Sequence, residues 1–145
     1  LLKTYIDTSL LAAYYSPESG SKAAESYLIN QSSLYISFLT KVELSSAIRK
    51  KVLLKELRNE EALLINNAFK NDISDGYYQI LPIVLKDYHK AQLLLSDFSN
   101  KLGLHALDAI HIAVAKRENL NLATSDKQLA KNAQKIGVTT DFIKF

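Results

Sequence analysis

The sequence is 145 residues long, with 48% hydrophobic and 23% charged residues, a formal net charge of +3 and no cysteine. This length favours one domain, residues 1–145, with a substantial core, and no apolar run approaches the roughly 18 residues that a membrane span requires. The absence of cysteine excludes disulfides and thiolate metal sites and favours a cytoplasmic protein, whereas so small a net charge does not by itself indicate a nucleic-acid partner.

The first half of the chain alternates between short predicted strands and helices. We expect strands at residues 3–6, 34–37 and 77–81, and helices at residues 10–15, 22–30, 40–50 and 55–70. Asp7, Thr8 and Ser9 follow the first strand and form a helix N-cap signal. Residues 40–43 match the Ser/Thr-x-x-Glu capping box, which predicts that Thr40 opens a helix.

The second half continues the alternation and sets the fold class. We expect helices at residues 85–98 and 104–115, a strand at 121–123, a helix opened by a second capping-box pattern at 125–128 and ended by Gly137, and a last strand at 138–140. Strands that alternate with helices pair in parallel through crossover connections. The sequence therefore predicts an α/β fold, a three-layer α/β/α sandwich whose central, mainly parallel sheet has about five short strands.

Residues 104–115 are an unusual helix, because apolar residues occupy nearly every face of it. Such a helix belongs in the interior, yet it carries Asp108. A carboxylate in an apolar setting is costly unless it is hydrogen-bonded, paired or bound to a metal. No Lys or Arg lies one turn away on this segment, so the partner of Asp108 must come from elsewhere in the fold.

Four acids lie where a functional crevice is expected. Asp7 and Asp126 follow predicted strands, and Glu43 and Asp108 lie near the starts of helices. Helix capping explains several of them singly. In an open parallel sheet, however, the crevice lies at the carboxyl ends of the strands, where all four side chains could converge.

Convergence of these acids requires a cation. Two carboxylates about 5 Å apart repel by roughly 3 kcal/mol at an effective dielectric of about 20. Oxygen ligands suit Mg²⁺ or Mn²⁺ rather than a tetrahedral zinc site. Either ion lowers the pKa of an attacking water and stabilises charge on a phosphate, so the natural reaction is phosphodiester hydrolysis. Hydroxyls beside Asp7 and Asp126 could orient water there, although helix capping explains them equally well.

The sequence resembles the PIN domains, and among them the VapC-type toxin ribonucleases of type II toxin-antitoxin systems. The resemblance spans essentially the whole chain and rests on four stretches, residues 5–9, 42–44, 107–113 and 123–126, in the order and at the spacings of the family. It implies that acidic metal-binding positions are occupied by Asp7, Glu43, Asp108 and Asp126. Ser9 and Ser125 match the accessory hydroxyls of the family. Some members carry a further acid shortly after the fourth, where this chain has Lys127 and Gln128.

The resemblance also implies an activity and partners. It implies a Mg²⁺- or Mn²⁺-dependent endoribonuclease with an RNA substrate, a homodimer with a basic groove, and a cognate antitoxin protein that covers the site. PIN domains also occur in RNA processing outside toxin systems, so the nuclease prediction is stronger than the toxin prediction. Neither the RNA target nor the number of metal ions follows from the sequence.

A basic run gives a candidate RNA-binding segment. Five cations fall within ten residues, namely Arg49, Lys50, Lys51, Lys55 and Arg58. A solvated helix face explains this run about as well as contacts to RNA phosphates do.

Two other mechanisms are possible. A metal-free ribonuclease that uses His and Lys for acid-base catalysis would remain active in EDTA and leave cyclic phosphate ends. For His111, one turn from Asp108, we favour packing or a supporting hydrogen bond instead. An aspartyl-phosphate phosphatase is disfavoured, because no second acid stands two residues after Asp7 to serve as general acid.

A non-catalytic PIN-like module that binds RNA or a protein is the alternative from another class. Four grouped acids argue against it, since like charge near phosphates gives a binding module no advantage.

Overall fold

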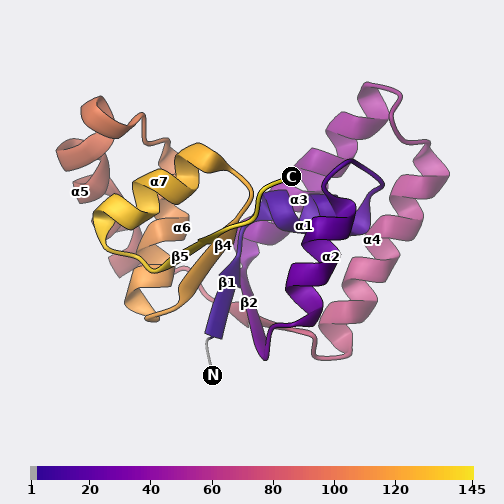
Figure 1. Ribbon diagram of the computed structural model, residues 1–145, viewed down its shortest axis with the longest axis horizontal. Helices are drawn as coiled ribbons and strands as arrows, with labels where there is room; N and C mark the ends of the chain where they lie inside the picture. The colour runs from indigo at the N-terminus through magenta and orange to yellow at the C-terminus, as the bar shows by residue number, and fades with distance from the viewer. Residues whose placement is uncertain (1–2) are drawn as a thin grey trace.

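A computed structural model describes residues 3–145, apart from the side chains of residues 98–102. Its centre is a five-stranded parallel sheet in the order β3-β2-β1-β4-β5 (Figure 1). The strands are β1 (Lys3–Ile6), β2 (Ser33–Ser37), β3 (Tyr78–Leu81), β4 (Asn121–Thr124) and β5 (Thr140–Phe142). The predicted parallel sheet is confirmed.

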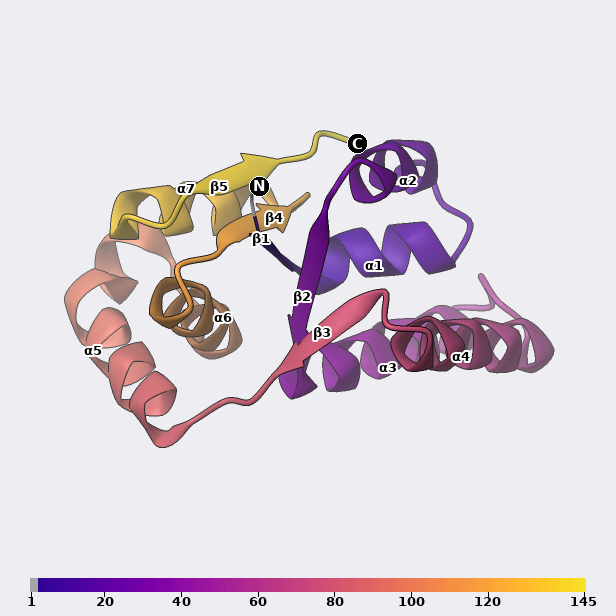
Figure 2. The same ribbon diagram turned by 90° about the horizontal axis from the view of Figure 1, so that it is seen from below.

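Helices cover both faces of this sheet, which confirms the predicted three layers (Figures 1 and 2). One face carries α1 (Thr8–Tyr15), α2 (Ser21–Ile29), α3 (Phe38–Leu53) and α4 (Asn59–Ser74), and the other carries α5 (Leu85–Leu102), α6 (Ala106–Arg117) and α7 (Lys127–Ile136). The chain builds outward from β1 to β3 and then returns to place β4 on the other side of β1. The strand order therefore reverses between β1 and β4, the place where parallel sheets bind ligands.

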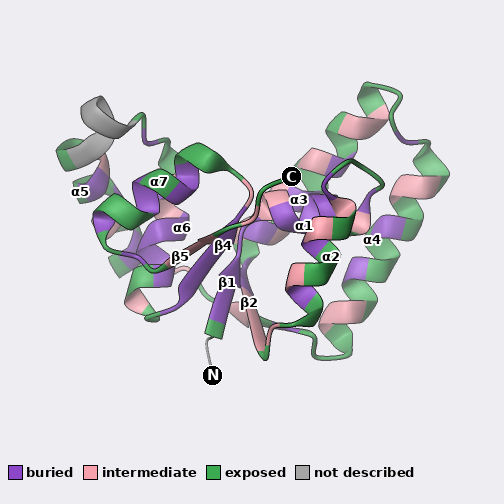
Figure 3. Cartoon of the chain, in the orientation of Figure 1, coloured by how far each residue is buried: buried purple, intermediate pink, exposed green. Residues whose placement is uncertain are grey.

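The two central strands divide their side chains between two hydrophobic cores. Ile6 and Ala123 pack with the α1–α4 layer, whereas Tyr5 and Leu122 pack with the α5–α7 layer. This alternation follows from the two-residue period of a strand. All four side chains have no exposed surface, so β1 and β4 are buried on both faces (Figure 3). The ends of these strands are thereby held in fixed positions beside one another.

The start of α3 differs from the expected capping box. Ser37 is the N-cap and accepts a hydrogen bond from the Thr40 N–H at 3.4 Å, while Thr40 Oγ1 accepts one from the Ser37 N–H at 3.2 Å. The helix therefore begins at Phe38, and the predicted cap at Thr40 is wrong. Because Glu43 lies in the second turn and caps nothing, its carboxylate is available for other contacts.

Other element boundaries also moved for local reasons. Lys55 has φ +62° and terminates the turn after α3, so α4 begins at Asn59. The N-cap of α7 is Asp126 rather than Ser125. The N–H groups of Gly137 and Val138 bond back to carbonyls of α7, so β5 begins at Thr140, two residues later than expected. Among the described residues, no helix is long and apolar enough to cross a membrane.

Candidate active site

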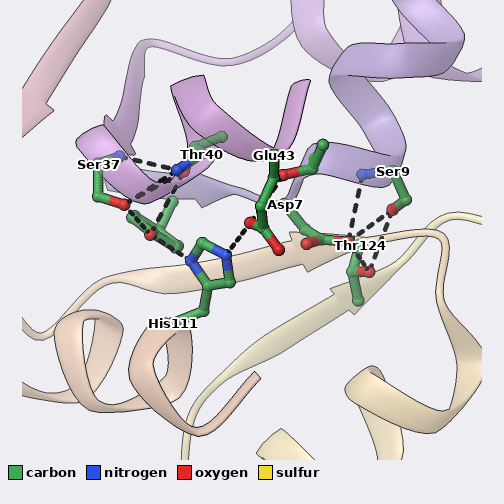
Figure 4. A network of polar contacts seen from close by, with 9 residues as sticks. Asp7, Ser9, Ser37, Thr40, Glu43, His111 and Thr124 are labelled. Carbon is green, nitrogen blue, oxygen red and sulfur yellow. Dashed lines mark hydrogen bonds and ion pairs between the residues drawn. The ribbon is translucent and has the colours of Figure 1, made fainter. Parts of the chain in front are cut away.

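Asp7 lies at the point where the strand order reverses, immediately after β1, and is 7% exposed. Its Oδ2 accepts hydrogen bonds from the hydroxyls of Ser9 at 2.7 Å and Thr124 at 2.8 Å (Figure 4). The Ser9 N–H also points to this oxygen at 3.4 Å. One oxygen of Asp7 is therefore fixed by donors from α1 and β4.

The same two hydroxyls join the segments that follow β1 and β4. Ser9 Oγ accepts the N–H of Ser125 at 3.1 Å, and Thr124 Oγ1 accepts the N–H of Asp126 at 2.9 Å. Ser9 thus lies beside an acid, as expected. Ser125 contributes its backbone amide to this arrangement, and the hydroxyl that contacts an acid on this side is that of Thr124.

Asp126 lies at the end of the neighbouring strand as the N-cap of α7. Its Oδ1 accepts the N–H groups of Gln128 at 2.9 Å and Leu129 at 3.0 Å. A carboxylate in this position is also favoured by the helix dipole. The sequence predicts Asp126 in the first turn after a Ser125 cap, whereas it is itself the N-cap, and this role occupies only one of its two carboxylate oxygens.

Asp108 reaches the same region from the first turn of α6, behind its N-cap residue His105. Burial and, after it, the negative charges of Asp7 and Asp126 together raise the pKa of Asp108 to about 6. The three aspartates are therefore close enough to affect one another. Within residues 3–97 and 103–145, no hydrogen bond or ion pair reaches the Asp108 carboxylate, and only the charges of His111 and His105 lower its pKa.

Glu43 lies beside this group on α3. Its Oε1 accepts hydrogen bonds from Thr8 Oγ1 at 3.1 Å and from Nε2 of His111. Burial alone would raise the pKa of Glu43, but the hydrogen bond and charge of His111, with Thr8, lower it below its usual value. His111 thus makes a supporting hydrogen bond, as we favoured, although to Glu43 rather than to Asp108. Its link to Tyr5 was not predicted, and no sequence signal marks it.

The donor chemistry of this cluster fits a hard divalent cation. Asp7, Asp126 and Glu43 each use one carboxylate oxygen for positioning, and their other oxygens accept no hydrogen bond from the described part of the chain. Oxygen ligands of this kind suit Mg²⁺ or Mn²⁺. As their side chains stand, no group of three or more His, Asp or Glu residues among those described is arranged to hold a metal ion. The cluster is therefore an arrangement of positioned acids rather than a finished coordination shell.

The basic run lies apart from the acids. Lys50 follows Glu43 by seven residues of α3, which is roughly 10 Å of helix rise. Lys51 pairs with Glu18 at 2.6 Å and Arg58 with Glu61 at 2.9 Å. The remaining cations of the run are exposed, namely Arg49, Lys50 and Lys55. The structure does not bring this run into the acid cluster.

Comparisons with known proteins agree with this architecture. The PIN domain model matches residues 4–135, whereas no curated protein gives a significant match. The fold is similar to VapC20 of Mycobacterium tuberculosis, a sarcin-ricin loop cleaving toxin, with a TM-score of 0.71, 14% identity and coverage of 94% of this chain and 97% of that chain. DNA-bound VapBC from Salmonella typhimurium has a TM-score of 0.68 and 18% identity, and the match covers 98% of both chains. FitAcB from Neisseria gonorrhoeae has a TM-score of 0.67 and 19% identity, and the match covers 94% of this chain and 95% of that chain. The family match, which covers most of the sequence, shows that this chain belongs to the PIN domain family.

Proposed function

We propose that this protein is a Mg²⁺- or Mn²⁺-dependent endoribonuclease and the toxin component of a type II toxin-antitoxin system. The observation that carries the proposal is the convergence of Asp7, Asp108 and Asp126 where the strand order reverses, with the pKa of Asp108 raised to about 6. An acid whose ionisation is opposed by burial and by two neighbouring aspartates destabilises the fold unless a cation binds there. Membership of the PIN domain family supports a nuclease.

Each acidic side chain has a definable task in this proposal. The metal would be held by Asp7, Asp108, Asp126 and Glu43, and it would supply a water of lowered pKa and stabilise charge on the phosphate. Ser9 and Thr124 hold Asp7 at its Oδ2 and direct its other oxygen away from them. Asp126 is held in the same way by the first turn of α7. Fixing the ligands in advance lowers the cost of ordering them around an ion.

The partners are proposed from the structural neighbours. VapC20 is a toxin that cleaves the sarcin-ricin loop, and other neighbours were solved as toxin-antitoxin complexes. We therefore propose an RNA substrate and a cognate antitoxin that covers the acid cluster. The homodimer is proposed from the family resemblance alone. The exposed cations Arg49, Lys50 and Lys55 would contact RNA phosphates beyond the cleavage site.

We expect the purified protein to cleave a mixed pool of structured RNAs with Mn²⁺ or Mg²⁺ and to lose this activity in EDTA. Product ends distinguish the mechanisms, because hydrolysis by a metal-activated water leaves 5′-phosphates, whereas attack by the ribose 2′-hydroxyl leaves cyclic phosphates. Ligation of the products followed by sequencing identifies the cleavage sites and distinguishes 5′-phosphate ends from cyclic phosphate ends. Cleavage that survives EDTA and leaves cyclic ends would contradict the proposal, as would binding of RNA without cleavage under every condition.

A further inference from the structure

A network of buried polar side chains lies behind Glu43. Tyr5, Ser37 and Thr40 have no exposed surface, and His111 is 1% exposed. Tyr5 belongs to the hydrophobic core of the α5–α7 layer, and His111 lies on α6 between the buried residues of the same core. Burying this many polar groups is costly unless they are hydrogen-bonded, so the contacts among them specify one arrangement.

These side chains form a continuous path that ends at the acid cluster (Figure 4). The Tyr5 hydroxyl donates to Ser37 Oγ at 2.8 Å and lies 2.5 Å from Nδ1 of His111. Nε2 of His111 donates to Glu43 Oε1, because a carboxylate oxygen can only accept. The imidazole ring is therefore held on one side by a strand and itself holds Glu43 on the other.

The same contacts connect Glu43 to the segments that carry the aspartates. Its two donors are Thr8, which follows Asp7, and His111, which lies one turn after Asp108. The Glu43 carboxylate lies between the His111 ring and Asp7 in Figure 4. Without His111, the Glu43 side chain would keep the Thr8 hydroxyl as its donor and could turn toward solvent about its three rotatable bonds, because it is 23% exposed.

We propose that His111 is a positioning residue that, braced by Tyr5, fixes Glu43 so that its Oε2 is presented to the metal site. The inference deepens the proposed function and rests on it. Because His111 is buried, its N–H needs an acceptor, and the acceptor here is a carboxylate of the acid cluster rather than a backbone carbonyl. An outer partner that orients a metal-binding carboxylate typically contributes about 10–100-fold to metal affinity or activity.

Two amide substitutions separate the contacts of the ring. In His111→Asn the short amide reaches the position of Nδ1, near Tyr5, but falls short of Glu43. In His111→Gln the longer amide can place an N–H near the position of Nε2. We expect His111→Asn to lower Mn²⁺ affinity and kcat by about 10–100-fold with little change in KM, and His111→Gln to recover most of that loss.

A double-mutant cycle then tests whether His111 acts through Glu43. If it does, His111→Asn should have no further effect on Mn²⁺ affinity in a Glu43→Gln background. Tyr5→Phe, which keeps the ring and removes only the hydroxyl, should lower Mn²⁺ affinity less than His111→Asn, and it provides the test if both His111 variants fail to fold. Thermal unfolding of each variant serves as the folding control.

The results that would overturn the inference are distinct from failure of the proposed function. Wild-type Mn²⁺ affinity in both His111→Asn and Tyr5→Phe would overturn the role of His111. The role would also be overturned if His111→Asn and His111→Gln lost Mn²⁺ affinity equally and if these losses added fully to that of Glu43→Gln in the double variants. If Mn²⁺ affinity is also unchanged in Asp108→Asn, the metal site itself is wrong. If only Asp108→Asn abolishes binding, the metal site stands and the positioning role is wrong.

Discussion

Asp108→Asn is expected to reduce RNA cleavage by roughly 10²–10³-fold and at the same time to stabilise the metal-free protein at neutral pH. The loss of activity follows from the position of Asp108 near two other aspartates, where it is the acid without a hydrogen bond from the described residues. The asparagine amide keeps the size of the side chain and removes its charge. The variant should therefore fold and lose catalysis.

The gain in stability follows from the direction of the pKa shift. The pKa of Asp108 rises from 3.8 to about 6 on folding, so the folded state binds the proton more tightly than the unfolded state. The protonated Asp108 carboxyl therefore contributes stability that is complete below about pH 4 and is lost as the pH rises through 6. At neutral pH the ionised carboxylate lowers the free energy of unfolding by up to about 3 kcal/mol, and by less in practice because Asp108 is partly exposed.

Thermal unfolding in EDTA measures this effect. Asp108→Asn should unfold at a higher temperature than wild type at pH 7.5 and at about the same temperature at pH 4. Asp97→Asn, at an exposed position of α5, is the matched control and should leave the midpoint unchanged at both pH values. A wild type as stable as Asp108→Asn at pH 7.5 would show that the cluster does not oppose ionisation of Asp108.

Arg117→Met is expected to lower the free energy of unfolding by about 3 kcal/mol. Arg117 makes two hydrogen bonds to Asp87, at 2.7 and 3.0 Å, and donates to the carbonyl of Pro82 at 2.9 Å. Asp87 is 1% exposed, so loss of the arginine leaves a buried carboxylate whose one remaining donor in the described part of the chain is the Val84 N–H. This pair joins α5 to α6, the helix that carries Asp108.

Chemical denaturation measures that loss directly. On heating, the midpoint of unfolding should fall by roughly 6–12 °C. Glu118→Gln is the matched control. It removes the ion pair between Arg117 and Glu118, and the Glu118 side chain is more exposed than that of Asp87. That variant should change the free energy of unfolding by less than about 1 kcal/mol. Equal destabilisation by the two variants would show that the Asp87 contact is not the one that stabilises this helix pair.

The sequence was sufficient to predict the layers of the fold and the edge of the sheet at which the candidate site lies. Alternating short strands and helices required parallel pairing, and this placed Asp7 and Asp126 at the carboxyl edge of the sheet. The apolar helix around Asp108 indicated a carboxylate that lacked a local partner. These predictions depend on local pattern and on the geometry of strand pairing, both of which can be read from residue types.

The partners of the site residues could not be predicted in the same way. His111 contacts Tyr5 across 106 positions of sequence and Glu43 across 68. Which side chains meet at such distances depends on strand order and helix rotation, and neither is encoded in a local pattern. The start of α3 was misplaced for a related reason. Two overlapping capping patterns, Ser37 with Thr40 and Thr40 with Glu43, competed, and the end of β2 selected the first.

Binding of Mn²⁺ to the metal-free protein tests most directly whether the acid cluster is a divalent-cation site. Titration of wild type and Asp108→Asn, followed by the electron paramagnetic resonance signal of free Mn²⁺, measures it. We predict that wild type binds Mn²⁺ at neutral pH and that its affinity falls by up to about tenfold per pH unit below pH 6, where protons compete for Asp108. Asp108→Asn should bind far more weakly at neutral pH. Equal binding by the two proteins, or no binding by wild type, would contradict the account.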